Sequence, residues 1–263
     1  MTRCWVALVA TVILTAGASA ETLVWSNILT DTSWTSAASP YIVNGDIRVR
    51  FESTLTIEAG VEIRFEGGAS LATDAGASID AAGTKALPVV FTSASRAPAS
   101  GDWDGVMVYA SVSSSFERCV FEYAGTCLEL NVSDPTIDHC TFRSSGTGVR
   151  CLRSSPRIIG CELNGVEAAA LYCWGRESAP EVSDSNFFGN GWNVYLSSYT
   201  APLAVITAEG NWWGSDVEGA IDATIYDGDD NPSIYGVVDY DPWLSGQPVE
   251  ATSWGGLKAL FIE

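Results

Sequence analysis

The chain contains very little positive charge. Its 263 residues include 13 Lys and Arg against 32 Asp and Glu, with a single histidine, so the formal net charge is −19 at pH 7. Such an excess of negative charge repels nucleic acid and anionic membrane surfaces, so we expect no nucleic-acid partner. Neutral polysaccharides are not repelled, whereas a polyuronate would need a local cationic patch or a bridging metal ion.

Long hydrophobic runs are also missing, apart from one near the start. Residues Trp5–Leu14 follow Arg3, and the small residues Ala18, Ser19 and Ala20 precede Glu21. This run is short for a membrane span, and the pattern is typical of a secretory signal peptide over residues 1–20. We therefore expect a secreted or extracytoplasmic protein with no transmembrane segment after cleavage; an uncleaved anchor is the alternative.

Helical periodicity is absent from the first half of the chain. Segments such as Asp46–Phe51 and Val61–Phe65 instead alternate apolar with other residues, and glycines such as Gly60 and Gly76 separate them. Alternation of this kind indicates short strands with one buried face, joined by tight corners. No Pro- or Ser-rich linker divides the chain before Ser245, which indicates one domain.

The segment from residue 116 to residue 196 repeats with a period of 21, 21 and then 24 residues. Apolar residues recur in step while the residues between them vary. A period of this length is typical of a solenoid whose successive rungs stack equivalent side chains. The columns are Phe116, Ile137, Ile158, Val182; Cys119, Cys140, Cys161, Ser185; Phe121, Phe142, Leu163, Phe187; Leu128, Val149, Leu171, Val194; and Leu130, Cys151, Cys173, Leu196.

Six of the seven cysteines follow the predicted signal peptide, which contains Cys4. An even number in an oxidising compartment commonly indicates disulfides. Stacked rungs are about 4.8 Å apart, however, slightly more than the Cβ separation of about 3.5–4.5 Å in a disulfide. We therefore expect buried free thiols, with one or two strained disulfides as the alternative.

Several segments resemble bacterial exported right-handed parallel β-helix repeat proteins of the pectate-lyase-like superfamily. They are Leu55-Thr-Ile-Glu-Ala-Gly-Val-Glu-Ile-Arg-Phe65, Ala82-Gly-Thr-Lys-Ala-Leu-Pro-Val-Val-Phe-Thr-Ser93, Gly101-Asp-Trp-Asp-Gly-Val106, Gly210-Asn-Trp-Trp-Gly-Ser215 and Asp239-Tyr-Asp-Pro-Trp-Leu244. The resemblance implies an all-β fold, a single-stranded right-handed parallel β-helix in the periplasm or at the surface of a bacterium. It says little about activity, because this architecture carries enzymes, glycan-binding surfaces and passive scaffolds.

These patterns define four segments of the chain. Residues 1–20 form the signal peptide, 21–40 an N-terminal cap, 41–244 the β-helix with a closing segment, and 245–263 a C-terminal tail. The tail ends in apolar residues at helical spacing, which could dock on the solenoid or be read by an export or anchoring system.

One outward-facing column carries aromatic residues. The repeat places Glu129, Arg150, Tyr172 and Tyr195 in this column, with Trp174 on a neighbouring position. Rings one rung apart offer apolar faces on which sugars can stack, and polar neighbours can bind hydroxyl groups. We predict carbohydrate binding here; the alternative is a ladder of rings that only stabilises the sheet.

Four arginines gather within one rung or at its border: Arg143, Arg150, Arg153 and Arg157. They could hold an acidic glycan, and lyases of similar shape use an arginine as the base in β-elimination. The alternative is ion pairing between rungs, because Glu122 precedes Arg143 by one period and Glu129 precedes Arg150.

The segment Asp227-Gly-Asp-Asp-Asn231 is rich in oxygen ligands. Asp227, Asp229 and Asp230 could bind calcium, although the spacing of an EF-hand loop is absent, and a polar turn is the alternative. Otherwise we expect no cofactor. His139 has no nucleophile neighbour, and we assign no catalytic residue.

The sequence thus predicts a secreted or cell-surface protein that binds or scaffolds a polysaccharide or cell-envelope glycan through its lateral aromatic face, without catalysis. Two alternatives stay open. One is a polysaccharide lyase or related glycan-modifying enzyme that uses the arginine cluster and calcium, and the other is a purely structural envelope protein.

Overall fold

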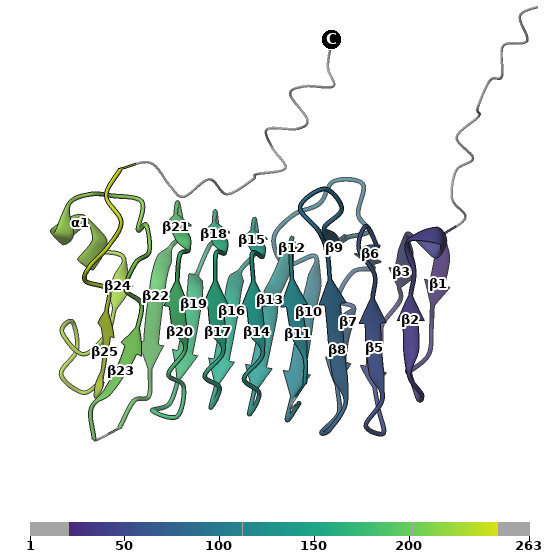
Figure 1. Cartoon of the computed structure of the whole chain (residues 1–263), viewed down its shortest axis with the longest axis horizontal. Coiled ribbons are helices and arrows are strands. Elements are labelled where there is room, and N and C mark those ends of the chain that lie inside the picture. The colour runs from purple at the N-terminus through teal and green to yellow at the C-terminus, as the bar shows by residue number, and fades with distance from the viewer. Residues whose placement is uncertain (1–20, 112, 201, 247–263) are drawn as a thin grey trace, which may run out of the picture.

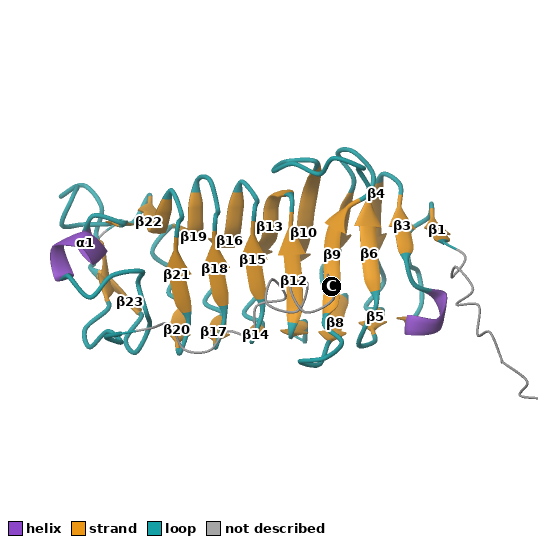
Figure 2. Ribbon diagram, turned by 90° about the horizontal axis from the view of Figure 1, so that it is seen from above, coloured by secondary structure: helices purple, strands orange, loops and turns teal. Residues whose placement is uncertain are grey.

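The computed structural model describes residues 21–111, 113–200 and 202–246. It is a solenoid in which three sheets run along the long axis, and each complete rung contributes one strand to each sheet (Figures 1 and 2). All strand pairs within these sheets are parallel. The expected single-stranded parallel β-helix is confirmed.

We refer to the three sheets as sheets A, B and C. Sheet A contains β1 (Thr22–Val24), β3 (Tyr41–Val43), β6 (Glu62–Phe65), β9 (Val89–Ser93), β12 (Cys119–Glu122), β15 (Thr141–Arg143), β18 (Glu162–Asn164) and β21 (Asn186–Phe188). Sheet B contains β4 (Asp46–Val49), β7 (Ser70–Thr73), β10 (Trp103–Tyr109), β13 (Ala124–Asn131), β16 (Thr147–Leu152), β19 (Ala169–Trp174), β22 (Trp192–Ser197) and β24 (Ile225–Tyr226). Sheet C contains β2 (Thr32–Trp34), β5 (Thr54–Ile57), β8 (Ser78–Ala82), β11 (Ser115–Glu117), β14 (Thr136–Asp138), β17 (Arg157–Ile159), β20 (Glu181–Ser183), β23 (Ala204–Thr207) and β25 (Gly236–Asp239).

The interior is a set of stacked apolar columns, in the register that the repeat predicted. Phe116 pairs with Ile137 in sheet C, and Phe121 pairs with Phe142 in sheet A. The ring of Phe121 stacks on Phe91 on one side and on Phe142 on the other, with centroids 4.5 and 5.1 Å apart. Burial of these columns along the whole axis supplies the main favourable free energy of folding.

The corners between strands are formed by residues in the left-handed backbone conformation. Arg118, His139, Gly160 and Asp184 occupy one such column, with φ between 50° and 62°. The corner N–H of Arg118 donates to the carbonyl of Asp138, and that of His139 donates to the carbonyl of Ile159, both at 2.8 Å. The left-handed geometry is thus compensated by hydrogen bonds to the next rung.

Sheet B contains an extra residue from β13 onward. Gly105 and Val106 are adjacent in β10, whereas their partners Thr126 and Leu128 are separated by Cys127. The following rungs keep this bulge, so Thr126 and Glu129, three residues apart, are both partly exposed. Strict alternation would place two such residues on opposite faces, so the bulge changes which side chains share the outer surface.

The six cysteines of the described chain are buried free thiols, as expected. Two of them accept hydrogen bonds from backbone amides: Cys140 Sγ lies 3.4 Å from the nitrogen of Cys119, and Cys161 Sγ lies 3.3 Å from that of Cys140. Burial raises the pKa of Cys127 to about 12 and raises that of Cys140 and Cys161 well above the usual value. These thiols are therefore poor nucleophiles that act as small core residues.

The two ends of the solenoid are irregular. Residues 21–40, for which we expected a cap, contain β1, β2 and a short 3₁₀ helix (Ser36–Ala38), and β1 and β2 form the ends of sheets A and C. The other end carries α1 (Glu218–Asp222) beside β24. The predicted signal peptide and the tail from residue 247 lie outside the described residues.

Candidate functional site

Three tyrosines stack along the outer surface of sheet B, near the end that carries α1. Tyr172 pairs in register with Tyr195, and Tyr195 pairs with Tyr226. The ring centroids of Tyr172 and Tyr195 are 5.7 Å apart, and those of Tyr195 and Tyr226 are 4.6 Å apart, with nearly parallel planes. Each ring is half-buried, so part of its face or edge is open to a ligand.

Trp192 joins this group because of the bulge in sheet B. The amides of Asn193 and Val194 both point to the carbonyl of Thr224, at 2.8 and 3.4 Å, and both side chains are buried. Trp192 and Tyr195 therefore share the outer face. The indole meets the Tyr195 ring edge to face, with centroids 6.0 Å apart.

The rings of Tyr172, Trp192 and Tyr195 border an open hollow of about 470 Å³, which we call the aromatic hollow. This volume lies in the range of small-ligand sites, about 300–1,000 Å³. Tyr226 stacks on Tyr195 beside this hollow. Small residues leave the space open, and a Cβ atom on Gly191 would lie 2.1 Å from the Glu167 carbonyl oxygen, which excludes a side chain there. Its lining residues are Glu167, Ala168, Ala169, Tyr172, Gly191, Trp192, Tyr195 and Ser197.

The other residues predicted for this site have different environments. Arg150 lies over the ring of Tyr172, 5.1 Å from its centroid, and Nη1 is 3.4 Å from a carboxylate oxygen of Glu129. It extends the ladder beside the hollow without lining it. Trp174 is 44% exposed and pairs in register with Ser197, but it does not line the hollow either.

Comparison with known families identifies the fold. Residues 27–116 match the family model described as a pectate-lyase like beta helix domain. The protein is a right-handed β-helix repeat protein. The matched segment covers the earlier rungs, so the aromatic hollow lies outside it. No curated protein and no solved structure matches the chain significantly.

In the described part of this β-helix protein, no helix combines the length and the apolar character needed to cross a membrane.

The four arginines predicted as a cluster do not form one site in the β-helix. Arg143 ends β15 of sheet A, Arg150 lies in β16 of sheet B, and Arg157 begins β17 of sheet C. Arg153 occupies a left-handed corner. Steps of seven residues are one third of a 21-residue rung, so they carry successive arginines to three different faces. The arginine-based site of the lyase alternative is therefore not assembled.

The expected ion pairs are present. Arg143 Nη2 lies 2.7 Å from Glu122 Oε2, and the Glu122 side chain is only 14% exposed. The Glu129–Arg150 pair is longer and more exposed. The first pair fixes Arg143 against sheet A.

The aspartate-rich segment of the β-helix protein forms a turn before β25. Asp227 is buried, and its two carboxylate oxygens accept the backbone N–H groups of Asp229 at 2.9 Å and Val238 at 2.8 Å. Burial raises the pKa of Asp227, and these hydrogen bonds oppose the shift. Asp230 accepts the N–H of Asp227. Within the described residues, no group of three or more His, Cys, Asp and Glu side chains is arranged to hold a metal ion.

Sequence reasoning missed two aromatic residues at this site, Trp192, which lines the hollow, and Tyr226, which stacks on Tyr195 beside it. Trp192 was missed because strict alternation from Tyr195 places it on the other face. Tyr226 lies beyond the repeating segment, so the period could not assign it a column. The pair Asn193-Val194 between Trp192 and Tyr195, where one inward residue was expected, was the available signal.

Proposed function

We propose that this β-helix protein binds a polysaccharide at the aromatic hollow and does not cleave it. The observation that supports this is the arrangement of three rings from two neighbouring rungs, Tyr172, Trp192 and Tyr195, around one open hollow. Tyr226 of the next rung stacks on Tyr195 beside it. Pyranose rings have apolar faces that pack on aromatic side chains, while their hydroxyl groups need polar partners nearby.

The polar partners at the hollow suit a neutral glycan. The side chain of Glu167, which is exposed, can accept hydrogen bonds from sugar hydroxyls, and the hydroxyl of Ser197 can donate or accept. No Lys or Arg side chain lines this hollow among the described residues, so it offers no counter-charge to a polyuronate. The rings follow one another along the solenoid axis, and a glycan chain lying along that axis would contact several of them.

The location that we propose is outside the cytoplasm, in keeping with the signal peptide expected over residues 1–20. A partner in the cell envelope or on the cell surface would be a glycan rather than nucleic acid, because the chain carries a formal charge of −19.

The test is co-elution of the mature protein with a panel of neutral and acidic polysaccharides on size-exclusion chromatography. We expect intact glycan chains that travel with the wild-type protein. Tyr195→Ala removes the central ring, and Trp192→Ala removes the edge-on ring; each should weaken binding about tenfold or more, in line with the energies of aromatic contacts. Tyr109→Ala is the matched control, because Tyr109 is an exposed tyrosine of sheet B that lies far from the hollow.

Each run is repeated with calcium and with a chelator, which tests Asp227, Asp229 and Asp230 as a calcium site. Shortened glycan chains would contradict the proposal and support the lyase alternative. Absence of any co-elution across the panel would also contradict it and leave the structural role.

A further inference from the structure

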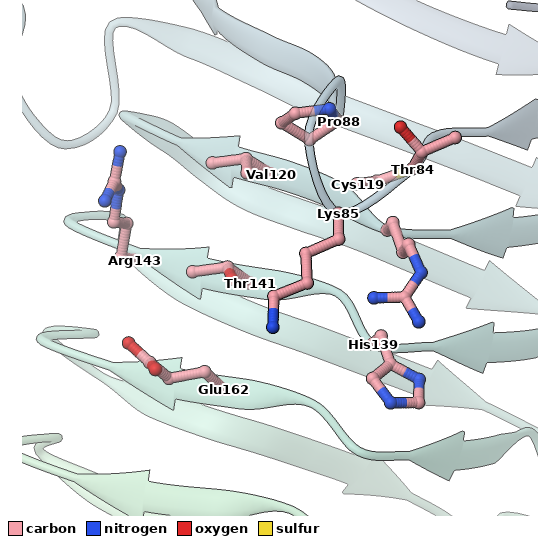
Figure 3. Close-up of a pocket in the computed structure, with 10 residues that line it drawn as sticks. Thr84, Lys85, Pro88, Cys119, Val120, His139, Thr141, Arg143 and Glu162 are labelled. Carbon is pink, nitrogen blue, oxygen red and sulfur yellow. The ribbon is translucent and has the colours of Figure 1, made fainter. Parts of the chain in front are cut away.

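A second, smaller hollow lies where sheet C turns into sheet A, and basic residues line it. Its volume is about 50 Å³. Lys85, Arg118 and Arg143 line it together with His139, which is the only histidine of the chain (Figure 3). Three of the thirteen Lys and Arg residues thus line one hollow on a protein with a net charge of −19. We call it the basic hollow.

A rigid loop between β8 and β9 carries Lys85. Thr84 N–H donates to the carbonyl of Leu87 at 2.9 Å, and Leu87 N–H donates back to the carbonyl of Thr84 at 3.2 Å. Gly83 packs against the corner at Arg118, where an added Cβ atom would lie 2.4 Å from the Arg118 carbonyl oxygen. The Lys85 side chain extends from this loop toward the strand that carries Thr141 (Figure 3).

The imidazole of His139 is held in one orientation. Its Nδ1 lies 2.7 Å from Asp138 Oδ1, and the ring covers Gly160 of the next rung. A Cβ atom on Gly160 would lie 3.1 Å from both Cε1 and Nε2, so the missing side chain makes room for the ring. The Nδ1 side is occupied by Asp138, which leaves Nε2 to contact a ligand.

The remaining cations differ in how much of their hydrogen-bonding capacity is used. Arg143 is fixed by Glu122. Arg118 has only a long contact, 3.8 Å, to the exposed carboxylate of Glu117. Within the described residues Lys85 forms no ion pair. Lys85 and Arg118 therefore keep most of their donors for a ligand.

One carboxyl group, that of Glu162, lines the same hollow. Burial raises its pKa, and the charge of Arg143 opposes the shift. Glu162 therefore loses its negative charge more readily than an exposed glutamate, and its protonated form can donate a hydrogen bond to an anion.

We propose that the basic hollow binds one tetrahedral oxyanion, a sulfate or phosphate group. The space is too small for a sugar ring or a nucleotide, but a water needs only about 10–15 Å³, so a group of several heavy atoms can enter. Donors approach from the loop, from the corner at Arg118 and from β15. A tetrahedral anion has acceptor oxygens in several directions and matches this arrangement, whereas a planar carboxylate is held by a single arginine fork.

Titration with sodium sulfate and sodium phosphate, against sodium chloride at matched ionic strength, tests the proposal. The readouts are calorimetry and the NMR signals of the single imidazole, which belong to His139. We expect saturable binding that is about tenfold weaker or more in Lys85→Met and in Arg118→Gln, because each loses charged hydrogen bonds. Arg96→Gln, at an exposed arginine outside the hollow, is the matched control and should bind as the wild type.

A response that follows ionic strength without saturation, or that is equal in Lys85→Met and Arg96→Gln, overturns the proposal. Lys85 is exposed on a loop, so its replacement does not disturb the core, and thermal unfolding of each variant confirms this. Tyr195→Ala should leave anion binding unchanged, which separates this result from that of the aromatic hollow.

The source of the anion is resolved by comparing dextran sulfate with unmodified dextran. The hollow is assigned to a sulfated chain if two results are obtained. Dextran sulfate binding must be lost in Lys85→Met, and free sulfate at equal sulfate concentration must not displace the dextran sulfate. Saturable binding of the inorganic ion alone assigns the hollow to a free ion. If the protein binds neither dextran sulfate nor the inorganic sulfate or phosphate ion, the proposal is overturned.

Discussion

The ring stack of sheet A allows the contribution of aromatic stacking to the free energy of unfolding to be measured. The same substitution, phenylalanine to leucine, is made separately at two positions of the stack. Phe121 and Phe142 both belong to this column and are both 0% exposed. Phe121 contacts three rings, those of Phe91, Phe142 and Phe116, whereas the one ring pair of Phe142 in the described residues is with Phe121. Leu163 occupies the next position of the column, so leucine fits there.

The expected magnitudes follow from these contacts. We take about 0.5 kcal/mol for each ring pair, so the free energy of unfolding should fall by about 1.5 kcal/mol in Phe121→Leu and by about 0.5 kcal/mol in Phe142→Leu. Each variant also has a small cost of changed packing, which should be similar at the two sites. Phe121→Ala, which also opens a cavity, should cost about 3–5 kcal/mol.

Urea unfolding under reducing conditions, followed by far-UV circular dichroism and tryptophan fluorescence together, measures these differences. Two probes are needed because rungs of a solenoid can unfold separately. Equal costs for Phe121→Leu and Phe142→Leu would refute the reasoning, since burial alone would then account for both.

Two further outcomes are expected. The six cysteines of the described residues should resist a thiol reagent such as DTNB in the native state, because all six are buried and burial raises the pKa of Cys127, Cys140 and Cys161. All six should react in guanidinium chloride, and fewer than six would indicate disulfides. Glu162→Gln should be more stable than the wild type at pH 7. The folded-state pKa of Glu162 is raised above its ordinary value of 4.5, so its stabilising contribution is complete below pH 4.5 and is lost as the pH rises through the folded-state pKa. Thermal unfolding between pH 4 and pH 8 checks this, and a difference that does not change with pH would contradict it.

The repeat in the sequence predicted the register because a solenoid leaves little freedom once its period is known. Four of the five columns in the repeating segment, such as Leu128 with Val149, pair in the structure as the spacing indicated. The column that begins at Cys119 is aligned by hydrogen bonds from backbone amides to the next side chain of the column. Glu129, Arg150, Tyr172 and Tyr195 likewise form the expected outward column.

The rest of the site could not be predicted because it depends on departures from the repeat. The residue that sheet B gains at Cys127 is kept in the later rungs, where Asn193 occupies the same place. It puts Trp192 on the same face of the sheet as Tyr195. The loop that carries Lys85 has no counterpart in the later rungs, so no column could place Lys85 beside His139. Closeness in the sequence suggested an arginine cluster that the structure does not form, since Arg143 and Arg157 lie on different sheets.

The direction of the hydrogen bonds between rungs has a mechanical consequence. Backbone hydrogen bonds such as those from the corner residues join one rung to the next, so they lie along the long axis. The elements β1 and α1 lie toward opposite ends of this axis (Figure 1). A pulling force applied between these ends loads the inter-rung contacts in series, and the weakest interface yields first. The protein should therefore extend under tension in steps of about one rung, each releasing roughly 21–24 residues of chain.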